Sequence, residues 1–201
     1  MKNTWIARAA LSAASLVIAG CAGSSPTMPL PPAANFVAPS AATNAIKNGC
    51  FSGLTGWKEV KGAGMDKSNP PSGSVSAVKG GYQSCKGSAF AGTTKAPAPN
   101  GFWGVAQTVK VTKAGKLSWW YWGGSTDQIK YGDQEVDVVM GGKTVDRCYK
   151  ALVINPKTDW KLGTCNLKKY ANKTVTLEFG VYDNGYKSTY DYWYVSDVSL
   201  E

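Results

Sequence analysis

Short segments in which apolar and polar residues alternate recur along the chain after residue 100. Every second residue is apolar over 174–181 (TVTLEFGV), and the segments 105–111 (VAQTVKV) and 135–140 (EVDVVM) alternate in a similar way. Successive side chains of a β-strand point to opposite faces, so a period of two predicts strands with one buried face.

Aromatic segments and turn residues extend this pattern. The segments 116–122 (KLSWWYW) and 192–200 (YWYVSDVSL) are rich in residues that favour strands. Turn sequences rich in Gly, Asn and Pro separate the segments, at 113–115, 141–143, 155–158 and 183–185. No helical period of useful length is present. The pattern predicts one all-β domain over residues 45–201, either a sandwich or a barrel.

The first 20 residues differ from the rest. They combine Lys2 and Arg8 with a 12-residue apolar run over 9–20. This run is too short to span a hydrocarbon core of about 30 Å as a helix, so residues 1–20 are predicted to be a cleaved secretory signal peptide.

The end of this segment, Ile18-Ala19-Gly20-Cys21, resembles the lipobox of bacterial lipoproteins. The resemblance implies a mature chain that begins at Cys21 and carries lipid there, palmitate included. Because Ala22 rather than Asp follows, it also implies the outer membrane of a Gram-negative bacterium. Residues 21–44 are predicted to be the lipidated cysteine and a flexible tether, since 22–44 holds five prolines and no charge.

The other four cysteines are predicted to form two disulfides, because an exported chain folds in an oxidising compartment. If 155–158 (NPKT) is a hairpin turn, residues that face each other across it have numbers that sum to 313, as Cys148 and Cys165 do. That pairing leaves Cys50 with Cys85. A four-thiolate zinc site is not expected, because the chain has no CxxC pair.

Composition excludes several kinds of chemistry. The chain has no histidine, which rules out a Ser–His–Asp triad and a His-ligated zinc. It has 22 Lys and Arg against 13 Asp and Glu, and loss of Lys2 and Arg8 with the signal leaves 20 against 13, a net charge of +7. The lysines are scattered along the sequence. The charge therefore favours acidic partners such as acidic polysaccharide, but no nucleic-acid site is predicted.

Several motifs along residues 45–201 occur in a recognisable order. They are NGCFSGLTGW at 48–57, the two segments within 107–122, TDW at 158–160 with 167–176, and YVSDVSL at 194–200. They resemble the motifs of carbohydrate-binding modules with the galactose-binding-like jelly roll. This resemblance implies a jelly-roll β-sandwich that binds a glycan and needs no catalytic residue of its own.

Many members of that family hold a structural calcium ion through a Glu after the opening Phe and an Asp of the closing motif. This chain has Ser52 and Ser196 at two of those positions and keeps Asp197. Calcium prefers about six to eight oxygen ligands, with several carboxylates among them. We therefore expect no cofactor, with Asp197 as a weak calcium candidate and the Cys50–Cys85 bridge holding the same corner.

The first candidate ligand site comes from the aromatic segment 116–122. Alternation places Trp120 and Trp122 on the surface opposite to the core-facing side chains, and Asp137 or Glu135 is expected alongside. The core-facing residues are Leu117, Trp119 and Tyr121. Indole faces stack on sugar C–H groups, while carboxylates accept hydrogen bonds from hydroxyls. The alternative is that loops or the tether cover these rings.

A second candidate site is the aromatic, polar loop near the C-terminus, which contains Tyr182, Asp183, Asn184, Tyr186 and Tyr190. The remaining tryptophans are expected in core or edge packing, at Trp57, Trp103, Trp160 and Trp193.

Three carboxylates are also expected on one sheet surface, Glu135, Asp137 and Glu178. Two carboxylates can hydrolyse a glycosidic bond, but exposed carboxylates on strands are usually solvated, so no enzyme activity is predicted.

The sequence thus predicts a non-catalytic, lipid-anchored envelope protein that binds carbohydrate, including acidic polysaccharide, through exposed aromatic residues. The alternative prediction is a structural lipoprotein that uses the same sandwich to dock an envelope protein, with the tryptophan pair at the centre of the interface.

Overall fold

The computed structural model describes residues 44–61, 74–98, 100–153 and 159–201. The predicted signal peptide, Cys21 and nearly all of the predicted tether lie outside the described residues. Within the described ranges, no helix is long and apolar enough to cross a membrane.

The described residues form ten β-strands and one short 3-10 helix, η1 (Lys168–Tyr170). In chain order the strands are β1 (Lys58–Lys61), β2 (Ser74–Lys79), β3 (Gly87–Gly92), β4 (Gly101–Lys110), β5 (Lys116–Ser125), β6 (Gly132–Met140), β7 (Lys143–Ala151), β8 (Lys161–Asn166), β9 (Thr174–Asp183) and β10 (Asp191–Leu200).

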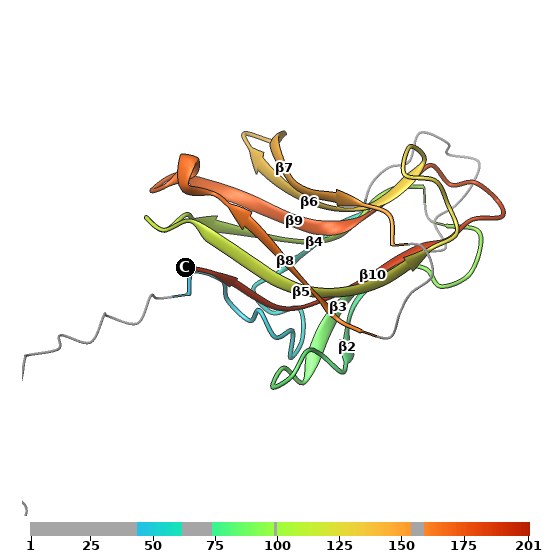
Figure 1. Cartoon of the computed structure of the whole chain (residues 1–201), viewed down its shortest axis with the longest axis horizontal. Coiled ribbons are helices and arrows are strands. Elements are labelled where there is room, and N and C mark those ends of the chain that lie inside the picture. Colours follow the sequence, from blue (N-terminus) through green and yellow to red (C-terminus); the bar gives the residue numbers. More distant parts are fainter. Residues whose placement is uncertain (1–43, 62–73, 99, 154–158) are drawn as a thin grey trace, which may run out of the picture. The chain divides into compact units, whose positions relative to one another are not determined.

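The strands form two antiparallel sheets that lie face to face (Figure 1). The first sheet has the order β1-β4-β9-β6-β7, and the second sheet has the order β2-β3-β10-β5-β8. Among the described strands, only β2–β3 and β6–β7 are consecutive strands of the same sheet, and the chain crosses from one sheet to the other after β1, β3, β4, β5, β7, β8 and β9. This arrangement confirms the predicted all-β jelly-roll sandwich.

The alternating segments fill the space between the sheets. Strands β4 and β9 pair over ten residues, from Gly101 opposite Asp183 to Lys110 opposite Thr174. The apolar positions of β9 are Val175, Leu177, Phe179 and Val181, and each is at most 1% exposed. Burying a side chain of this size contributes about 1.5–3 kcal/mol, so the period-two pattern determines which face of each strand turns inward.

Strand β5 also turns its predicted core residues inward. Leu117, Trp119 and Tyr121 are 0%, 0% and 8% exposed. The Trp119 ring meets Phe179 of the first sheet edge-on, with centroids 5.8 Å apart. On the neighbouring strand β8, Gly163 lies opposite Trp119, and a Cβ at that position would be 2.2 Å from the indole. Strand β8 can pair here because residue 163 has no side chain.

Both predicted disulfides, Cys50–Cys85 and Cys148–Cys165, are confirmed. The prediction that Cys148 and Cys165 face each other across a hairpin is wrong, however. Strand β7 pairs with β6 at the edge of the first sheet, while β8 pairs with β5 at the edge of the second. Cys148 and Cys165 therefore link the edges of two different sheets. The predicted turn at 155–158 lies outside the described residues.

Candidate functional site

Trp120 and Trp122 lie on the outer face of the second sheet, as predicted, and both are half-buried. The Trp120 ring stacks on Tyr82 with centroids 3.5 Å apart, and the Trp122 ring stacks on Tyr194 at 4.9 Å. One face of each indole is therefore already covered by a tyrosine. The alternative, that loops or the tether cover these rings, holds in part for Trp120, because Tyr82 lies in the β2–β3 connection. Trp122 is covered instead from the neighbouring strand β10, by Tyr194.

A hollow of about 410 Å³ adjoins the second of these stacks. Trp122, Tyr194 and the predicted packing residue Trp160 line it, together with Lys79 and Ser88. It offers three aromatic side chains and one cation.

The prediction that Asp137 or Glu135 lies alongside the tryptophans is wrong. Both acidic residues lie on β6, which belongs to the first sheet, whereas the tryptophans lie on β5 in the second. Alternation within a strand specifies its two faces, but it does not specify which sheet the strand joins.

The acidic residues of β6 form a charged network with β7. The Arg147 guanidinium lies 2.8 Å from Asp137 and 3.0 Å from Glu135, and Lys150 lies 2.7 Å from Asp133 and 3.3 Å from Glu135. Burial, followed by the neighbouring Asp133, raises the pKa of Glu135 to about 8. The cations of β7 thus pair with Glu135 and Asp137, two of the three carboxylates that the sequence offered for chemistry, but, among the described residues, not with Glu178.

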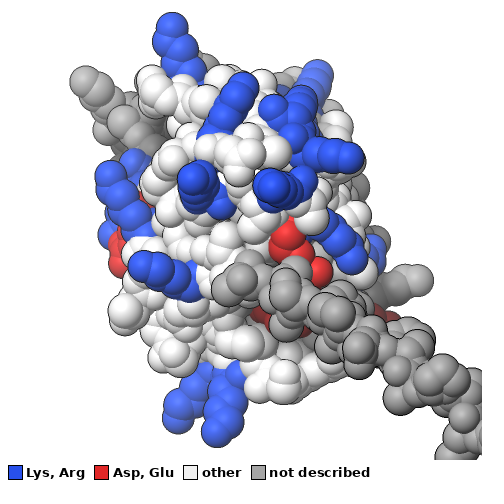
Figure 2. All heavy atoms as spheres, turned by 90° about the vertical axis from the view of Figure 1, so that its left-hand side faces the viewer, with Lys and Arg blue, Asp and Glu red and all other residues white. Residues whose placement is uncertain are grey.

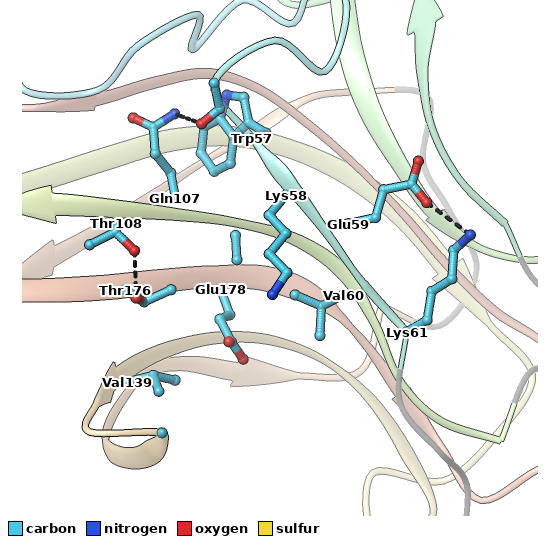
Figure 3. Close-up of a pocket in the computed structure, with 13 residues that line it drawn as sticks. Trp57, Lys58, Glu59, Val60, Lys61, Gln107, Thr108, Val139, Thr176 and Glu178 are labelled. Atoms are coloured by element: carbon cyan, nitrogen blue, oxygen red, sulfur yellow. Dashed lines mark hydrogen bonds and ion pairs between the residues drawn. The ribbon is translucent and has the colours of Figure 1, made fainter.

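The first sheet also forms one wall of a groove of about 980 Å³ (Figure 3). Ala106, Thr108 and Thr176 lie along it, with Lys58 and Glu178 among its charged residues. The Thr108 and Thr176 hydroxyls lie 2.9 Å apart and hydrogen bond to each other. Burial raises the pKa of Glu178. Trp57 is the aromatic residue of this groove and is only 8% exposed, so the groove offers hydrogen bonds but no open stacking face.

A third hollow, which we call the tyrosine pocket, lies between the β5–β6 and β9–β10 connections. Its volume is about 480 Å³. Tyr131 and Tyr186 line it and are 40% and 62% exposed. Its other lining residues are Thr126, Asp127, Gln128, Asn184 and Thr189.

Hydrogen bonds within the two connections hold the tyrosine pocket in shape. The Asn184 backbone N–H donates to the Tyr131 carbonyl at 2.9 Å, which ties one connection to the other. The Asn184 side-chain oxygen accepts from the Tyr186 N–H at 3.2 Å, and the Tyr186 carbonyl accepts from the Thr189 hydroxyl at 3.2 Å. The tyrosine rings are thus presented from an internally bonded frame.

Only part of the second candidate site, the predicted loop over 182–190, lies in the tyrosine pocket. Asn184 and Tyr186 line the tyrosine pocket. Tyr182 instead lies within β9, between Phe102 of β4 and Asp133 of β6, and Asp183 is fully buried. Tyr190 packs near Tyr192, with centroids 6.2 Å apart.

Sequence reasoning missed Gln128 and Tyr131, which stand in the polar, aromatic segment STDQIKYG at 125–132. An aromatic residue beside an amide residue in a connection is the signal that could have identified them.

One end of the sandwich is rich in lysine (Figure 2). Six exposed lysines come from the β4–β5 turn and from the η1 region, Lys110, Lys113, Lys116, Lys168, Lys169 and Lys173. The two regions are joined where the Leu167 N–H donates to the Gly115 carbonyl and the Asn172 N–H to the Val111 carbonyl. We call this surface the lysine end. Residues that are scattered in the sequence therefore gather in space.

The corner at Asp197 matches the expectation for the disulfide. A carboxylate oxygen of Asp197 lies within 4.8 Å of the Cys50 and Cys85 sulfurs, and Asp197 itself is exposed. Sulfurs that are joined in a disulfide do not act as thiolate ligands, so this group supplies one carboxylate. The weak calcium candidate stays a prediction.

No family model and no curated protein matches the chain. Its structural neighbours include carbohydrate-binding modules, the class that the sequence resemblance named. A family 61 module in complex with β-1,4-galactotriose has 16% identity and a TM-score of 0.49, over 79% of this chain and 97% of that one. A family 11 module of a Clostridium thermocellum cellulase has 13% identity and a TM-score of 0.44, over 75% and 89%.

A protein of another kind is also among the neighbours. The K1 cleaved adhesin domain of Lys-gingipain from Porphyromonas gingivalis has 14% identity and a TM-score of 0.48, over 76% of this chain and 94% of that one. The likeness to these structures concerns the fold, and no ligand follows from it.

Proposed function

We propose that this protein binds carbohydrate without catalysing a reaction, and that the tyrosine pocket is the binding site. The observation that carries the proposal is that two exposed tyrosines, Tyr131 and Tyr186, and two amide side chains, Gln128 and Asn184, line one hollow.

The chemistry of these groups matches that of a sugar. A phenol ring packs against the apolar C–H face of a pyranose, while amides donate and accept hydrogen bonds with hydroxyls. Asn184 contributes its amide N–H donors, because its side-chain oxygen already accepts from the Tyr186 N–H. The hollow of about 480 Å³ is within the range of about 300–1,000 Å³ found for small-molecule sites. It would accept one or two sugar units at the end or side of a glycan.

The two other hollows fit a sugar less well. The groove on the first sheet lacks an open aromatic face, and its two threonine hydroxyls already bond to each other. On the second sheet, Tyr82 and Tyr194 each cover one face of a tryptophan ring.

An acidic polysaccharide is the proposed preference among glycans. Support comes from the lysine end, whose exposed lysines would attract the anionic groups of a polymer that extends there from the tyrosine pocket, about 30 Å away. One of the six, Lys169, already pairs with Asp146 at 2.7 Å. Attraction between exposed charges is screened over about 8 Å at physiological salt, so this part of the binding should weaken as salt is raised.

The proposal includes a lipid anchor at Cys21 in the outer membrane of a Gram-negative bacterium, supported by the lipobox-like sequence before that residue. Replacement of Cys21 by Ala should release the protein from the membrane fraction and abolish labelling with palmitate. A Cys21→Ala protein that stays in the membrane fraction and is still labelled with palmitate would contradict the anchor.

Binding is tested by screening the intact chain, purified in detergent, on a glycan array that includes acidic bacterial polysaccharides. The pocket variant is Tyr131→Ala/Tyr186→Ala, and the matched aromatic control is Trp120→Ala/Trp122→Ala. We expect the pocket variant to lose binding, because stacking and the pocket wall are removed together, and the control to keep it.

The other outcomes contradict parts of the proposal. Loss of binding only in the tryptophan variant would place the site on the second sheet. Absence of binding to any glycan by the folded protein would refute carbohydrate binding and favour the alternative of docking an envelope protein.

A further inference from the structure

Three buried aspartates meet at the end of the sandwich that carries the tyrosine pocket. Asp127 follows β5, Asp183 ends β9 and Asp191 begins β10. One carboxylate oxygen from each lies within 4.8 Å of the other two. The three residues are only 8%, 0% and 0% exposed.

These carboxylates are not neutralised by the protein. Within the described ranges, no ion pair with Lys or Arg involves them. Asp127 Oδ2, Asp183 Oδ2 and both oxygens of Asp191 are buried without a hydrogen-bond partner. Burying an unpaired carboxylate is costly, and such groups in folded proteins are paired or coordinate a metal.

The unpartnered oxygens converge on one point beside Gly132. A Cβ at that residue would lie 2.2 Å from Asp191 Oδ2, 3.0 Å from Asp127 Oδ2 and 3.2 Å from Asp183 Oδ2. The space that these oxygens surround therefore exists because residue 132 has no side chain.

The remaining oxygens are held by the backbone. The Gln128 N–H donates to Asp127 Oδ1 at 2.7 Å, and the Gly185 N–H donates to Asp183 Oδ1. These bonds orient the two carboxylates so that their second oxygens turn toward Asp191. The arrangement leaves at least four oxygens for a cation, because both oxygens of Asp191 are unpartnered.

We propose that Asp127, Asp183 and Asp191 form a calcium-binding site that joins the β5–β6 connection to the start of β10. Calcium takes about six to eight oxygen ligands at about 2.3–2.6 Å and accepts both oxygens of one carboxylate. Magnesium needs near-ideal octahedral geometry and keeps several waters, which suits a buried site with three carboxylates less well.

The electrostatics agree with this assignment. Burial, followed by the adjacent Asp183, raises the pKa of Asp191 to about 9, which the neighbouring Ser125 hydroxyl opposes only in part. Burial also raises the pKa of Asp183. A bound divalent cation would lower the pKa of both carboxyl groups again, because it stabilises the ionised form of every carboxylate around it.

The site has a consequence for the tyrosine pocket, which rests on the proposed function. Asp127 lines the pocket, and Asp183 directly precedes Asn184, another lining residue. A cation held between them fixes the two connections that present Tyr131 and Tyr186. Cation binding itself does not depend on any glycan and is measured separately.

The site is tested by calorimetric titration of Ca²⁺ into the intact chain, purified in detergent and stripped with EDTA. We expect one tightly bound Ca²⁺ per chain and much weaker binding of Mg²⁺. At 100 times the dissociation constant, Ca²⁺ should raise the melting temperature by about 5–10 °C in a domain of this size.

The test variant is Asp191→Asn, with Asp197→Asn as the matched control. In EDTA near pH 7, Asp191→Asn should melt no lower than the wild type, because a pKa of about 9 already leaves Asp191 uncharged there and Asn is a neutral side chain of the same shape. Ca²⁺ should then raise the melting temperature of the wild type and of Asp197→Asn, but not that of Asp191→Asn. If Asp191→Asn does not fold, Asp127→Asn at the pocket edge provides the same comparison.

Three results would overturn the site. They are absence of Ca²⁺ binding by the wild type, undiminished binding by Asp191→Asn and Asp127→Asn, and loss of binding only in Asp197→Asn. Calcium binding by a protein that binds no glycan would support the site and refute only the proposed function.

Discussion

The charged network on the first sheet makes a specific prediction about pH. Glu135 is 4% exposed, and its pKa is raised to about 8 by burial and by Asp133. In the unfolded chain the same side chain has a pKa of about 4.3. Between these values the folded protein keeps a proton that the unfolded chain has released.

The sign and size of the effect follow from linkage. Because the unfolded state binds fewer protons in this interval, the free energy of unfolding falls as pH rises from about 5 to 8. Each unit of difference between the folded and unfolded pKa corresponds to about 1.36 kcal/mol, so Glu135 alone can lower the free energy of unfolding by at most about 5 kcal/mol over this pH interval. Arg147 and Lys150 lie 3.0 and 3.3 Å from the Glu135 carboxylate and favour its ionised form, so we expect a loss of about 2–3 kcal/mol.

The assay is urea unfolding at pH 5, 6, 7 and 8 in EDTA, with both disulfides intact. Glu135→Gln places a neutral side chain of the same shape there and should lose less stability as pH rises. Glu59→Gln removes an exposed carboxylate and controls for net charge. Parallel loss of stability in wild type and Glu135→Gln would refute the reasoning, because the slope would then arise elsewhere.

Two further predictions concern packing and cross-links. Gly163→Ala should lower the free energy of unfolding in urea by about 1–3 kcal/mol, because the added Cβ overlaps the Trp119 indole. The control Gly53→Ala, whose Cβ would meet nothing within 4 Å, should change it by less than about 0.5 kcal/mol. Equal effects of the two substitutions would show that β8 shifts to accommodate the new Cβ. Replacing Cys148 and Cys165 by Ala removes a cross-link between residues 17 apart in the sequence and should lower the free energy of unfolding by about 3 kcal/mol in the same urea assay. An unchanged free energy would show that the edges of the two sheets are held together without the disulfide.

Much of the fold could be predicted because burial acts locally along a strand. The alternation over 174–181 and 116–122 identifies inward residues without any knowledge of the neighbouring strands. The cysteine pairing succeeded although its hairpin was wrong. Cys148 lies on the edge strand β7 and Cys165 on the edge strand β8, and the chain crosses from one sheet to the other between them, so the two cysteines meet across the layers rather than within a ladder.

The arrangement of the candidate sites could not be predicted in the same way. Asp137 was expected beside Trp120, but strand order depends on pairings between distant segments, and β6 joins the other sheet. The tyrosine pocket and the three aspartates combine two connections more than 50 residues apart in the sequence. Taken singly, Asp127, Asp183 and Asp191 have the pattern of ordinary turn and strand-end residues.

The strand register also relates the proposed anchor to the proposed binding site. Gly101 and Asp183 mark the tyrosine-pocket end of the β4–β9 pair, and Lys110 and Thr174 mark the lysine end. Ten residues at about 3.3 Å each separate these ends by about 30 Å. The Ala45 N–H donates to the Leu200 carbonyl, and Glu201, the next residue, exchanges backbone hydrogen bonds with Lys116, so the chain enters the domain at the lysine end. A chain anchored through residues before 44 would therefore attach at the end away from the pocket. With the proposed anchor, Tyr131 and Tyr186 would stay accessible to a glycan, and the six lysines would lie nearest the point where the predicted tether joins the domain.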